Sequence, residues 1–216
     1  MVCGMERSAT TRRRPHASRG DVREARLLEI AEGLLRDGAF ESTSIAEIAA
    51  AADITRSAFY FYFASKERLL ERLIEATLAE FIDRRLSDLD ARDAPPAERL
   101  RRLLHGVAEM WVEHGVVLSA AAELAGSVPA LFDRIAGVIA SGIEALTPIL
   151  AEHDQDTDPV TVRETVSALL WMGERTFYVL ARSNPSPEEY HALADRLLVV
   201  WVRAVGIEDE PGEGPA

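Results

Sequence analysis

The chain has 216 residues, of which 48% are hydrophobic and 28% charged, and this composition is typical of a globular protein with a core of its own. No apolar run approaches the roughly 18–20 residues that span a bilayer, so we expect no membrane segment. The N-terminus lacks the apolar stretch of a secretory signal, and the only cysteine is Cys3, which excludes an internal disulfide. The sequence therefore favours a cytoplasmic protein.

Charge is distributed unevenly along the chain. Residues 1–72 contain 12 basic and 11 acidic residues, whereas residues 73–216 contain 12 and 25, which gives the net charge of −12. Seven arginines lie in the first 26 residues, among them Arg12, Arg13 and Arg14. We expect residues 1–20 to form a disordered, arginine-rich tail. The asymmetry favours anion binding by the N-terminal part, although a plain solubilising tail has the same composition.

The first predicted helix covers 22–36 and closes at Gly38. Its apolar residues keep the spacing i, i+3, i+4, i+7 and i+8 that defines one helical face: Leu27, Ile30, Ala31, Leu34 and Leu35. Ser44 and Glu47 then have the spacing of a capping box, which predicts a second, short helix that ends by Ala52.

A turn at Asp53 follows, after which we expect Thr55 to cap a third helix and Ser65 to cap a fourth, running to about residue 89. Five further helices are predicted over 95–114, over 116–124, from 127 onward with a kink or break at Pro148, over 158–182 and over 186–206. Residues 208–216 are polar and expected to be disordered. The fold class is therefore all-α, with about nine helices.

The second and third helices have the lengths and the short connection of a helix-turn-helix. Asp53 stands where the turn requires a left-handed residue, which aspartate tolerates at modest cost. In such a motif the early residues of the second helix face base edges in the major groove, and here these are Thr55, Arg56 and Ser57. Arg56 can reach a guanine with two donors.

Five consecutive aromatic residues, 59–63, follow these polar positions. Because they sweep every face of a helix, one core cannot receive all of them. We expect Phe59 and Phe63 to point inward, Tyr60 and Tyr62 to face phosphates, and Phe61 to lie at the junction with the fourth helix. The alternative is that the aromatic run forms a hydrophobic hinge.

Lys66 is the only lysine and falls in the first turn of the fourth helix. A cation is unfavourable there for the helix dipole, so a bound phosphate would explain it. The alternative is that Lys66 is merely solvated.

Three segments, 43–49, 52–63 and 65–69, resemble the TetR family of one-component transcriptional regulators. The resemblance implies a helix-turn-helix DNA-binding domain over residues 21–67 and a helical ligand-binding and dimerisation domain over 68–207. The family usually has glycine at the position of Asp53. Together with the arguments above, the predicted contacts to double-stranded DNA are Ser44, Thr55, Arg56, Ser57, Tyr60, Tyr62, Lys66, Arg12, Arg13 and Arg14.

The segments 174–176 and 198–202 also resemble one repressor of this family. That resemblance implies a homodimer joined by a four-helix bundle of the eighth and ninth predicted helices, and a long apolar tunnel in each regulatory domain. Where that repressor places two asparagines near its ligand, this chain has Leu170 and Gly173. We therefore expect a more apolar or differently shaped pocket.

Bulky residues spread over four predicted helices, with glycines between them, favour a pocket for a small hydrophobic ligand, although any one of them could simply fill a core. Glu174 would be an expensive buried acid unless it is paired with Arg175, Arg134, a partner subunit or a ligand hydroxyl. The predicted ligand contacts are Met110, Trp111, Phe132, Leu170, Trp171, Gly173, Glu174, Phe177, Tyr178 and Trp201.

No catalytic or metal-binding pattern is found. The five histidines have no metal-ligand spacing, and neither a phosphate-binding glycine loop nor a GxSxG motif occurs. We therefore expect no enzyme activity, no cofactor and no metal. The predicted function is a ligand-responsive regulator, most simply a repressor released from a palindromic operator by an apolar molecule. The alternative is a helical small-molecule-binding or adaptor protein without sequence-specific DNA binding.

Overall fold

The computed structural model describes residues 19–89, 94–153 and 158–207, and within these ranges all regular secondary structure is α-helix, joined by turns and loops. The all-α prediction is confirmed. The tails expected to be disordered, with Arg12, Arg13 and Arg14, lie outside the described residues except for the last two positions of the first tail. The helices are α1 (Arg19–Arg36), α2 (Ile45–Ala51), α3 (Arg56–Tyr62), α4 (Lys66–Leu89), α5 (Pro96–Leu124), α6 (Pro129–His153), α7 (Pro159–Ala181) and α8 (Pro187–Ala204).

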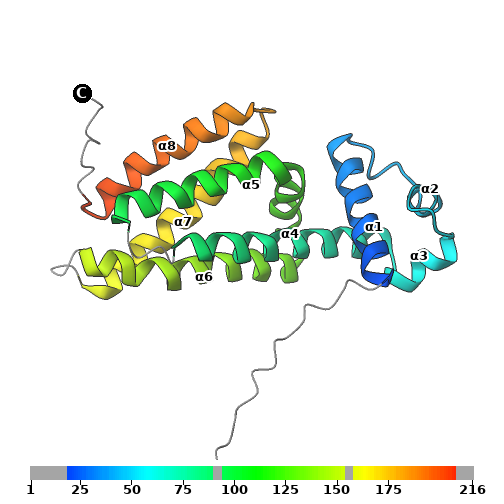
Figure 1. Ribbon diagram of the computed structural model, residues 1–216, viewed down its shortest axis with the longest axis horizontal. Coiled ribbons are helices and arrows are strands. Elements are labelled where there is room, and N and C mark those ends of the chain that lie inside the picture. The colour runs from blue at the N-terminus through cyan, green and yellow to red at the C-terminus, as the bar shows by residue number, and fades with distance from the viewer. Residues whose placement is uncertain (1–18, 90–93, 154–157, 208–216) are drawn as a thin grey trace, which may run out of the picture.

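The helices form two parts joined by α4 (Figure 1). Helices α1, α2 and α3 gather at one end of the molecule, and α4 starts there and runs into the second part. In that second part α6 lies along α4, α8 lies along α5, and α7 contacts α5, α6 and α8. One helix thus belongs to both parts.

Two predicted helix starts, those of α7 and α8, are confirmed by their hydrogen bonds. Ser186 and Glu189 form a complete capping box at α8, in which the Ser186 amide donates to Glu189 Oε2 at 2.7 Å. At α7 the Thr161 amide donates to the Asp158 carboxylate at 3.3 Å, and a proline occupies the first helical position. These caps satisfy amides that the first turn of a helix leaves without partners.

One predicted helix boundary is wrong, and of the kink or break predicted at Pro148 the break does not occur. The segments 95–114 and 116–124 form one helix, α5, so the described residues hold eight helices rather than nine. The expected break survives only as a kink, because His114 has φ −125° and ψ 20° inside the helix. Pro148 does not break α6, which continues through it to His153.

Two hydrophobic cores stabilise the protein. The C-terminal core lies among α5, α6, α7 and α8 and includes Trp111, Phe177 and Trp201. The N-terminal core contains Phe59 and residues of α1 to α4, and it extends to residues of α5 and α6 such as Val117 and Leu131. Because this core crosses residue 67, the two predicted domains share buried contacts; the boundary itself stays a prediction.

Helix α6 differs from the expectation that no apolar segment reaches membrane-spanning length. Residues Pro129–Ala151 are long and apolar enough by length and composition, with a mean hydropathy of 1.4, and 22% of that stretch is buried. The sequence hides this because charged residues such as Asp133, Arg134 and Glu144 interrupt the apolar run. One such helix is weak evidence for a membrane span, since core helices of soluble proteins have the same character.

Candidate nucleic-acid interface and ligand cavity

Helices α2 and α3 form a helix-turn-helix of two seven-residue helices. The turn between them is closed by the Ile54 amide, which donates to the Ala49 carbonyl at 3.0 Å. Asp53 has φ +55°, the left-handed conformation that the sequence predicted for this position. A glycine would adopt it without the steric cost that a Cβ atom brings.

Both helices of the motif begin at a side-chain cap. The Glu47 amide donates to Ser44 Oγ at 3.3 Å. In return the Ser44 hydroxyl and amide donate to Glu47 Oε2 at 2.7 and 2.8 Å, and these two bonds to the carboxylate, the hydroxyl first, hold the pKa of Glu47 below its usual value. At α3 the Ala58 amide donates to Thr55 Oγ1 at 3.2 Å. Ser44 and Thr55 therefore position the motif, and both remain exposed at its surface.

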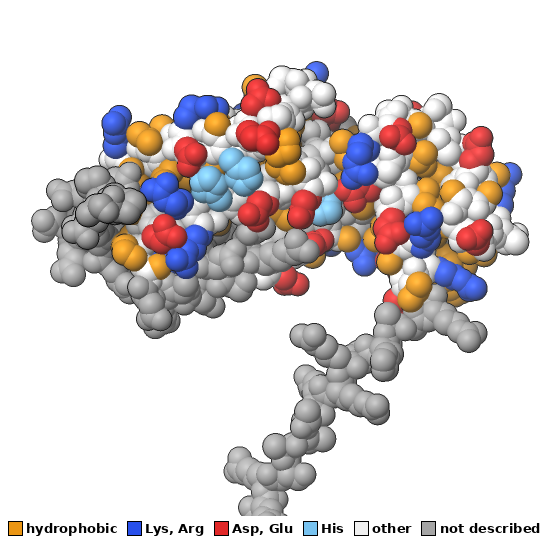
Figure 2. Space-filling model, turned by 45° about the horizontal axis from the view of Figure 1, so that its top comes forward, with side chains coloured by type: hydrophobic (Ala, Val, Ile, Leu, Met, Phe, Trp, Pro, Cys, Tyr) orange, Lys and Arg blue, Asp and Glu red, His pale blue; other side chains and the backbone are white. Residues whose placement is uncertain are grey.

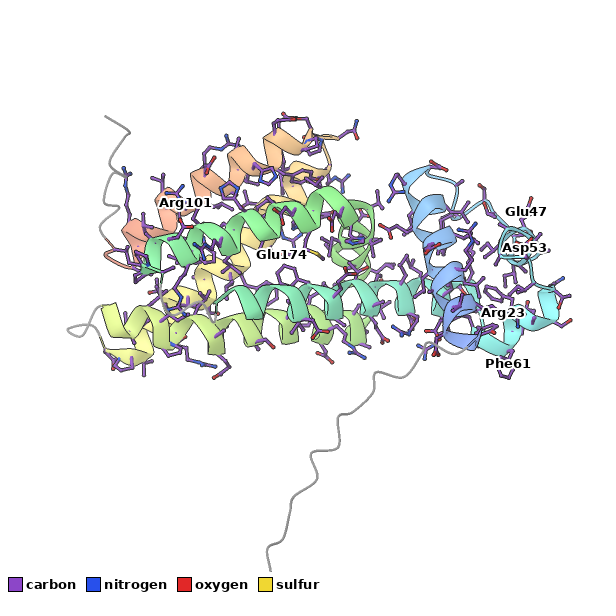
Figure 3. All side chains as sticks on the ribbon, viewed as in Figure 1. Arg23, Glu47, Asp53, Phe61, Arg101 and Glu174 are labelled. Atoms are coloured by element: carbon purple, nitrogen blue, oxygen red, sulfur yellow. The ribbon has the colours of Figure 1, made fainter. Side chains whose placement is uncertain are left out.

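The five aromatic residues divide between the core and the surface. Phe59 and Phe63 are buried in the N-terminal core, as expected. Tyr62 is only partly exposed and packs against the same core, which leaves it less available to DNA than expected. Tyr60 is 46% exposed and Phe61 is 85% exposed. Phe61 was expected at the junction with the fourth helix, but it projects from the end of α3 into solvent (Figure 3).

The outer face of α3 carries the predicted base-reading residues. Thr55, Arg56, Ser57 and Tyr60 are all exposed. The Arg56 guanidinium lies 5.9 Å from the centre of the Tyr60 ring, so the tyrosine supports the arginine through a cation–π contact. A planar donor group held above an aromatic ring suits bidentate hydrogen bonding to a guanine.

Lys66 does not stand free for a phosphate. Its Nζ donates to the carbonyls of Phe40 at 2.9 Å, Glu41 at 2.8 Å and Thr43 at 3.5 Å, and its side chain is only 15% exposed. These three bonds use the three donors of an ammonium group. Lys66 thus ties the start of α4 to the loop between α1 and α2, and this corrects the premise of its predicted phosphate contact.

The second candidate site is a cavity of about 130 Å³ inside the C-terminal part, bordered by α4, α5, α6, α7 and α8. Its walls are almost wholly apolar. Seven predicted ligand contacts line it: Met110, Trp111, Leu170, Gly173, Glu174, Phe177 and Trp201. Sequence reasoning missed the contribution of α4, which supplies Leu78, Phe81 and Ile82. Apolar spacing alone does not distinguish residues that border a cavity from residues that fill a core.

Three predicted ligand contacts do not line the cavity. Phe132 is half exposed and stacks on Trp171, with ring centres 6.3 Å apart. Tyr178 lies near the surface, where the Arg182 guanidinium donates to its hydroxyl at 3.1 Å. Residue size and hydrophobicity predicted all three positions equally well, and only the direction of each side chain separates them from the other seven.

Among the described residues that line the cavity, Glu174 is the one charged side chain (Figure 3). Burial raises the pKa of Glu174, and the neighbouring Arg175 opposes this effect. Arg175 Nε is 3.8 Å from Glu174 Oε2, too far for a hydrogen bond. Among the described residues, neither Glu174 Oε2 nor the buried Trp201 Nε1 has a hydrogen-bond partner.

Histidines in the C-terminal part form polar contacts between helices. His105 on α5 has Nδ1 3.0 Å from His191 Nδ1 and Nε2 3.0 Å from Asp195 Oδ1, both on α8. Within the ranges that the structure describes, no three His, Cys, Asp or Glu side chains are grouped so that they could hold a metal ion.

The structure combines an exposed helix-turn-helix that contains an arginine with a second part that holds an apolar cavity, and one long helix joins the two. This arrangement is typical of a DNA-binding protein with a separate ligand cavity. The profile of the bacterial regulatory proteins of the tetR family matches residues 27–73, which cover most of α1, the helix-turn-helix and the start of α4. The N-terminal part of the chain is therefore a TetR-family helix-turn-helix DNA-binding domain, and the chain is similar to the transcriptional regulators of that family.

Individual relatives extend the likeness to the second part. The transcriptional regulator EthR of Mycolicibacterium smegmatis is 29% identical over 199 residues, which cover 89% of this chain and 90% of that protein. The structure of a TetR-like regulator from Rhodococcus sp. RHA1 is 25% identical, covers 90% of this chain and 100% of that one, and has a TM-score of 0.63. The fold is also that of FadR from Bacillus subtilis in complex with stearoyl-CoA, 19% identical with a TM-score of 0.63, covering 83% and 98% of the two chains.

Proposed function

We propose that this protein is a transcriptional repressor that leaves a palindromic operator when a small apolar molecule occupies the internal cavity. The observation that carries the proposal is the course of α4. This helix starts at Lys66, four residues after α3 ends, and its later residues Leu78, Phe81 and Ile82 border the cavity. Helix α4 therefore contacts both the proposed ligand and the DNA-binding helices. The proposed place of action is the cytoplasm.

The proposed DNA contacts are the exposed residues on the outer face of α3. Arg56 reads a base, Thr55 and Ser57 contact bases or phosphates, and Tyr60 donates its hydroxyl to a phosphate. Phe61 joins this set because its ring extends beyond the end of α3, where it can pack against a sugar. Arg12, Arg13 and Arg14 add phosphate or minor-groove contacts from the N-terminal tail.

A homodimer is proposed through α7 and α8. Support comes from large apolar side chains that these helices leave exposed: Val160, Val179, Val199 and Val200. A two-fold dimer holds two copies of α3 at a fixed separation, and successive major grooves on one side of DNA are roughly 34–36 Å apart. A ligand that shifts α4 changes this separation, and a coupling of about 1–3 kcal/mol weakens DNA binding about 5- to 150-fold.

The test is fluorescence anisotropy of the full chain with the DNA directly upstream of its own gene, beside a scrambled duplex, at two salt concentrations. We expect sequence-dependent binding that persists at the higher salt concentration. Arg56→Ala combined with Tyr60→Ala should abolish the preference for the natural duplex. Arg102→Ala, which alters an exposed arginine on α5 outside the proposed DNA, ligand and dimer contacts, is the matched control and should retain it.

Equal binding to both duplexes by the unaltered protein would contradict the proposal for this operator. Release by an apolar compound is tested in the same assay. A compound that binds the protein but leaves the anisotropy of the DNA complex unchanged would contradict the ligand-responsive part alone.

A further inference from the structure

The largely apolar wall of the cavity includes residues with unpaired polar atoms. Two of the residues that line the cavity, Glu174 and Trp201, each have a buried polar atom, Oε2 and Nε1, without a hydrogen-bond partner among the described residues. They come from different helices, α7 and α8, and one accepts hydrogen bonds while the other donates them. Buried polar atoms are nearly always paired, so two such atoms at one cavity indicate a ligand that pairs with them.

Glu174 cannot obtain its partner from the neighbouring arginine. The Arg175 side chain is 60% exposed, and its guanidinium lies 5.1 Å from the centre of the Tyr178 ring, directed to the surface. The 3.8 Å separation between Arg175 Nε and Glu174 Oε2 gives a long-range attraction without a hydrogen bond. The carboxylate of this cavity-lining residue therefore keeps unused acceptor capacity.

Trp201 brings its donor to the same region. An added Cβ at Gly173, the residue before Glu174, would lie 3.8 Å from Trp201 Cζ2. Cζ2 is bonded to the ring carbon that carries Nε1, so the polar edge of the indole lies near this stretch of α7. A contact of that length is an ordinary van der Waals contact, so the indole packs directly against α7 beside Glu174.

These two atoms, one acceptor and one donor, discriminate between the possible classes of ligand. A hydrocarbon leaves both without a partner. A fatty carboxylate matches the indole N–H but brings a second negative charge toward Glu174. An alkylammonium ion matches Glu174 but leaves the indole N–H without an acceptor. Only a neutral group that both donates and accepts satisfies both atoms.

We infer that the ligand is an apolar molecule with a neutral hydrogen-bonding head group, of which a primary alcohol is the simplest, donating to Glu174 and accepting from Trp201. This inference rests on the proposed function, because it assigns the chemical class of the molecule that occupies the regulatory cavity. The hydrocarbon part lies against the apolar walls, and the head group is read by α7 and α8.

The experiment is isothermal titration calorimetry of the full chain at pH 8 with 1-octanol, octanoate and octylamine, which share one chain length. We expect 1-octanol to bind about tenfold more tightly than either charged compound. Octanoate binding as tightly as 1-octanol would overturn the inference, and so would tighter binding of octylamine. Absence of detectable 1-octanol binding would overturn it as well.

Substitution of Glu174 should change the affinities for 1-octanol and for octanoate in opposite directions. A change in the shape of the cavity alone does not produce this result. Glu174→Gln should weaken 1-octanol about tenfold, since a hydrogen bond to an ionised group is lost, and should strengthen octanoate severalfold. Glu164→Gln, on an exposed position of the same helix, should change neither. Trp201→Phe, which keeps the ring and removes the N–H, should weaken 1-octanol severalfold; an unchanged affinity would remove Trp201 from the site.

The DNA assay separates this inference from the proposed function. If octanoate binds more tightly and also releases the operator, the ligand class is wrong and the ligand-responsive repressor stands. If 1-octanol binds with the expected preference but the operator stays bound, the ligand class stands and release by that ligand is refuted.

Discussion

Lys66 serves the fold at a position where a free cation would oppose the helix dipole. The carbonyls of Phe40, Glu41 and Thr43 surround its Nζ, and the Phe40 ring centre is 5.2 Å away. The charge is therefore stabilised by oxygen atoms of a loop more than 20 residues earlier in the chain. This contact fixes the loop that leads into the helix-turn-helix.

Removing the Lys66 ammonium should destabilise the protein. Lys66→Met keeps most of the apolar stem and leaves three carbonyls without their donor, so we expect the free energy of unfolding to fall by about 2–3 kcal/mol in urea titration. Arg68→Met, two residues further on and exposed, should change it by less than about 0.5 kcal/mol. Equal effects of the two substitutions would contradict a structural role for Lys66.

Glu174 should make stability depend on pH. Burial raises the pKa of its carboxyl in the folded state, so the folded protein binds this proton more tightly than the unfolded chain does. The resulting stabilisation is complete below the usual glutamate range and is lost as pH rises through the raised pKa. Glu174→Gln does not titrate, so it should be the more stable protein at pH 8, with the difference shrinking toward pH 5 in urea titrations. A less stable variant at pH 8 would show that Arg175 outweighs burial.

At the scale of elements, α5 connects the two parts of the molecule through a contact at its kink. His114, at the kink, has Nδ1 2.9 Å from Glu32 Oε1 on α1, and both side chains are largely buried. One turn before the kink, Met110 and Trp111 border the cavity. Helix α5 therefore offers a second connection, beside α4, between the cavity and the DNA-binding part.

The Glu32–His114 contact should be measurable as a coupling between two elements. A double-mutant cycle with Glu32→Gln and His114→Ala, followed by urea unfolding, should give a coupling energy of about 1 kcal/mol. The exposed pair Arg26–Glu29, within α1 alone, should give at most about 0.5 kcal/mol in a matched cycle. Additive effects of Glu32→Gln and His114→Ala would exclude the link.

For the whole molecule, assembly determines whether the two recognition helices can act together. Val199→Asp places a charge on the outer face of α8, so we expect a monomer by size-exclusion chromatography with light scattering and at least about tenfold weaker operator binding. Val112→Asp, at an equally large and exposed valine on α5, should stay dimeric. A dimeric Val199→Asp protein would place the interface elsewhere.

The molecule is acidic overall, and on the face shown in Figure 2 acidic and basic side chains are interspersed rather than gathered into one basic surface. The arginines before residue 19 should therefore carry much of the salt dependence of DNA binding. Deleting residues 1–18 should reduce the slope of log affinity against log salt concentration by about 2–4, since each phosphate contact contributes about 0.9. An unchanged slope would refute the role of the tail.

The parts of the fold that depend on neighbouring residues in the chain were predictable. The caps at Ser44, Thr55, Asp158 and Ser186, and the left-handed turn at Asp53, follow from bonds that span three to five residues. The helix-turn-helix was therefore correct in both position and extent. The kink at His114 was wrongly predicted as the end of one helix and the start of another. The local sequence indicates a weakened helix there, but it does not show whether packing on both sides of the kink keeps the helix continuous.

By itself the sequence determined the helical class, the recognition motif and the apolar character of the second half, because periodicity and capping are local properties of the chain. Only the tertiary structure decided the direction of individual side chains. It turned Phe132 and Trp171 away from the cavity, brought Leu78 and Phe81 of α4 to it, and gave Lys66 its three carbonyls. These contacts join residues far apart in the chain, and their geometry depends on how whole helices pack, which no local pattern records.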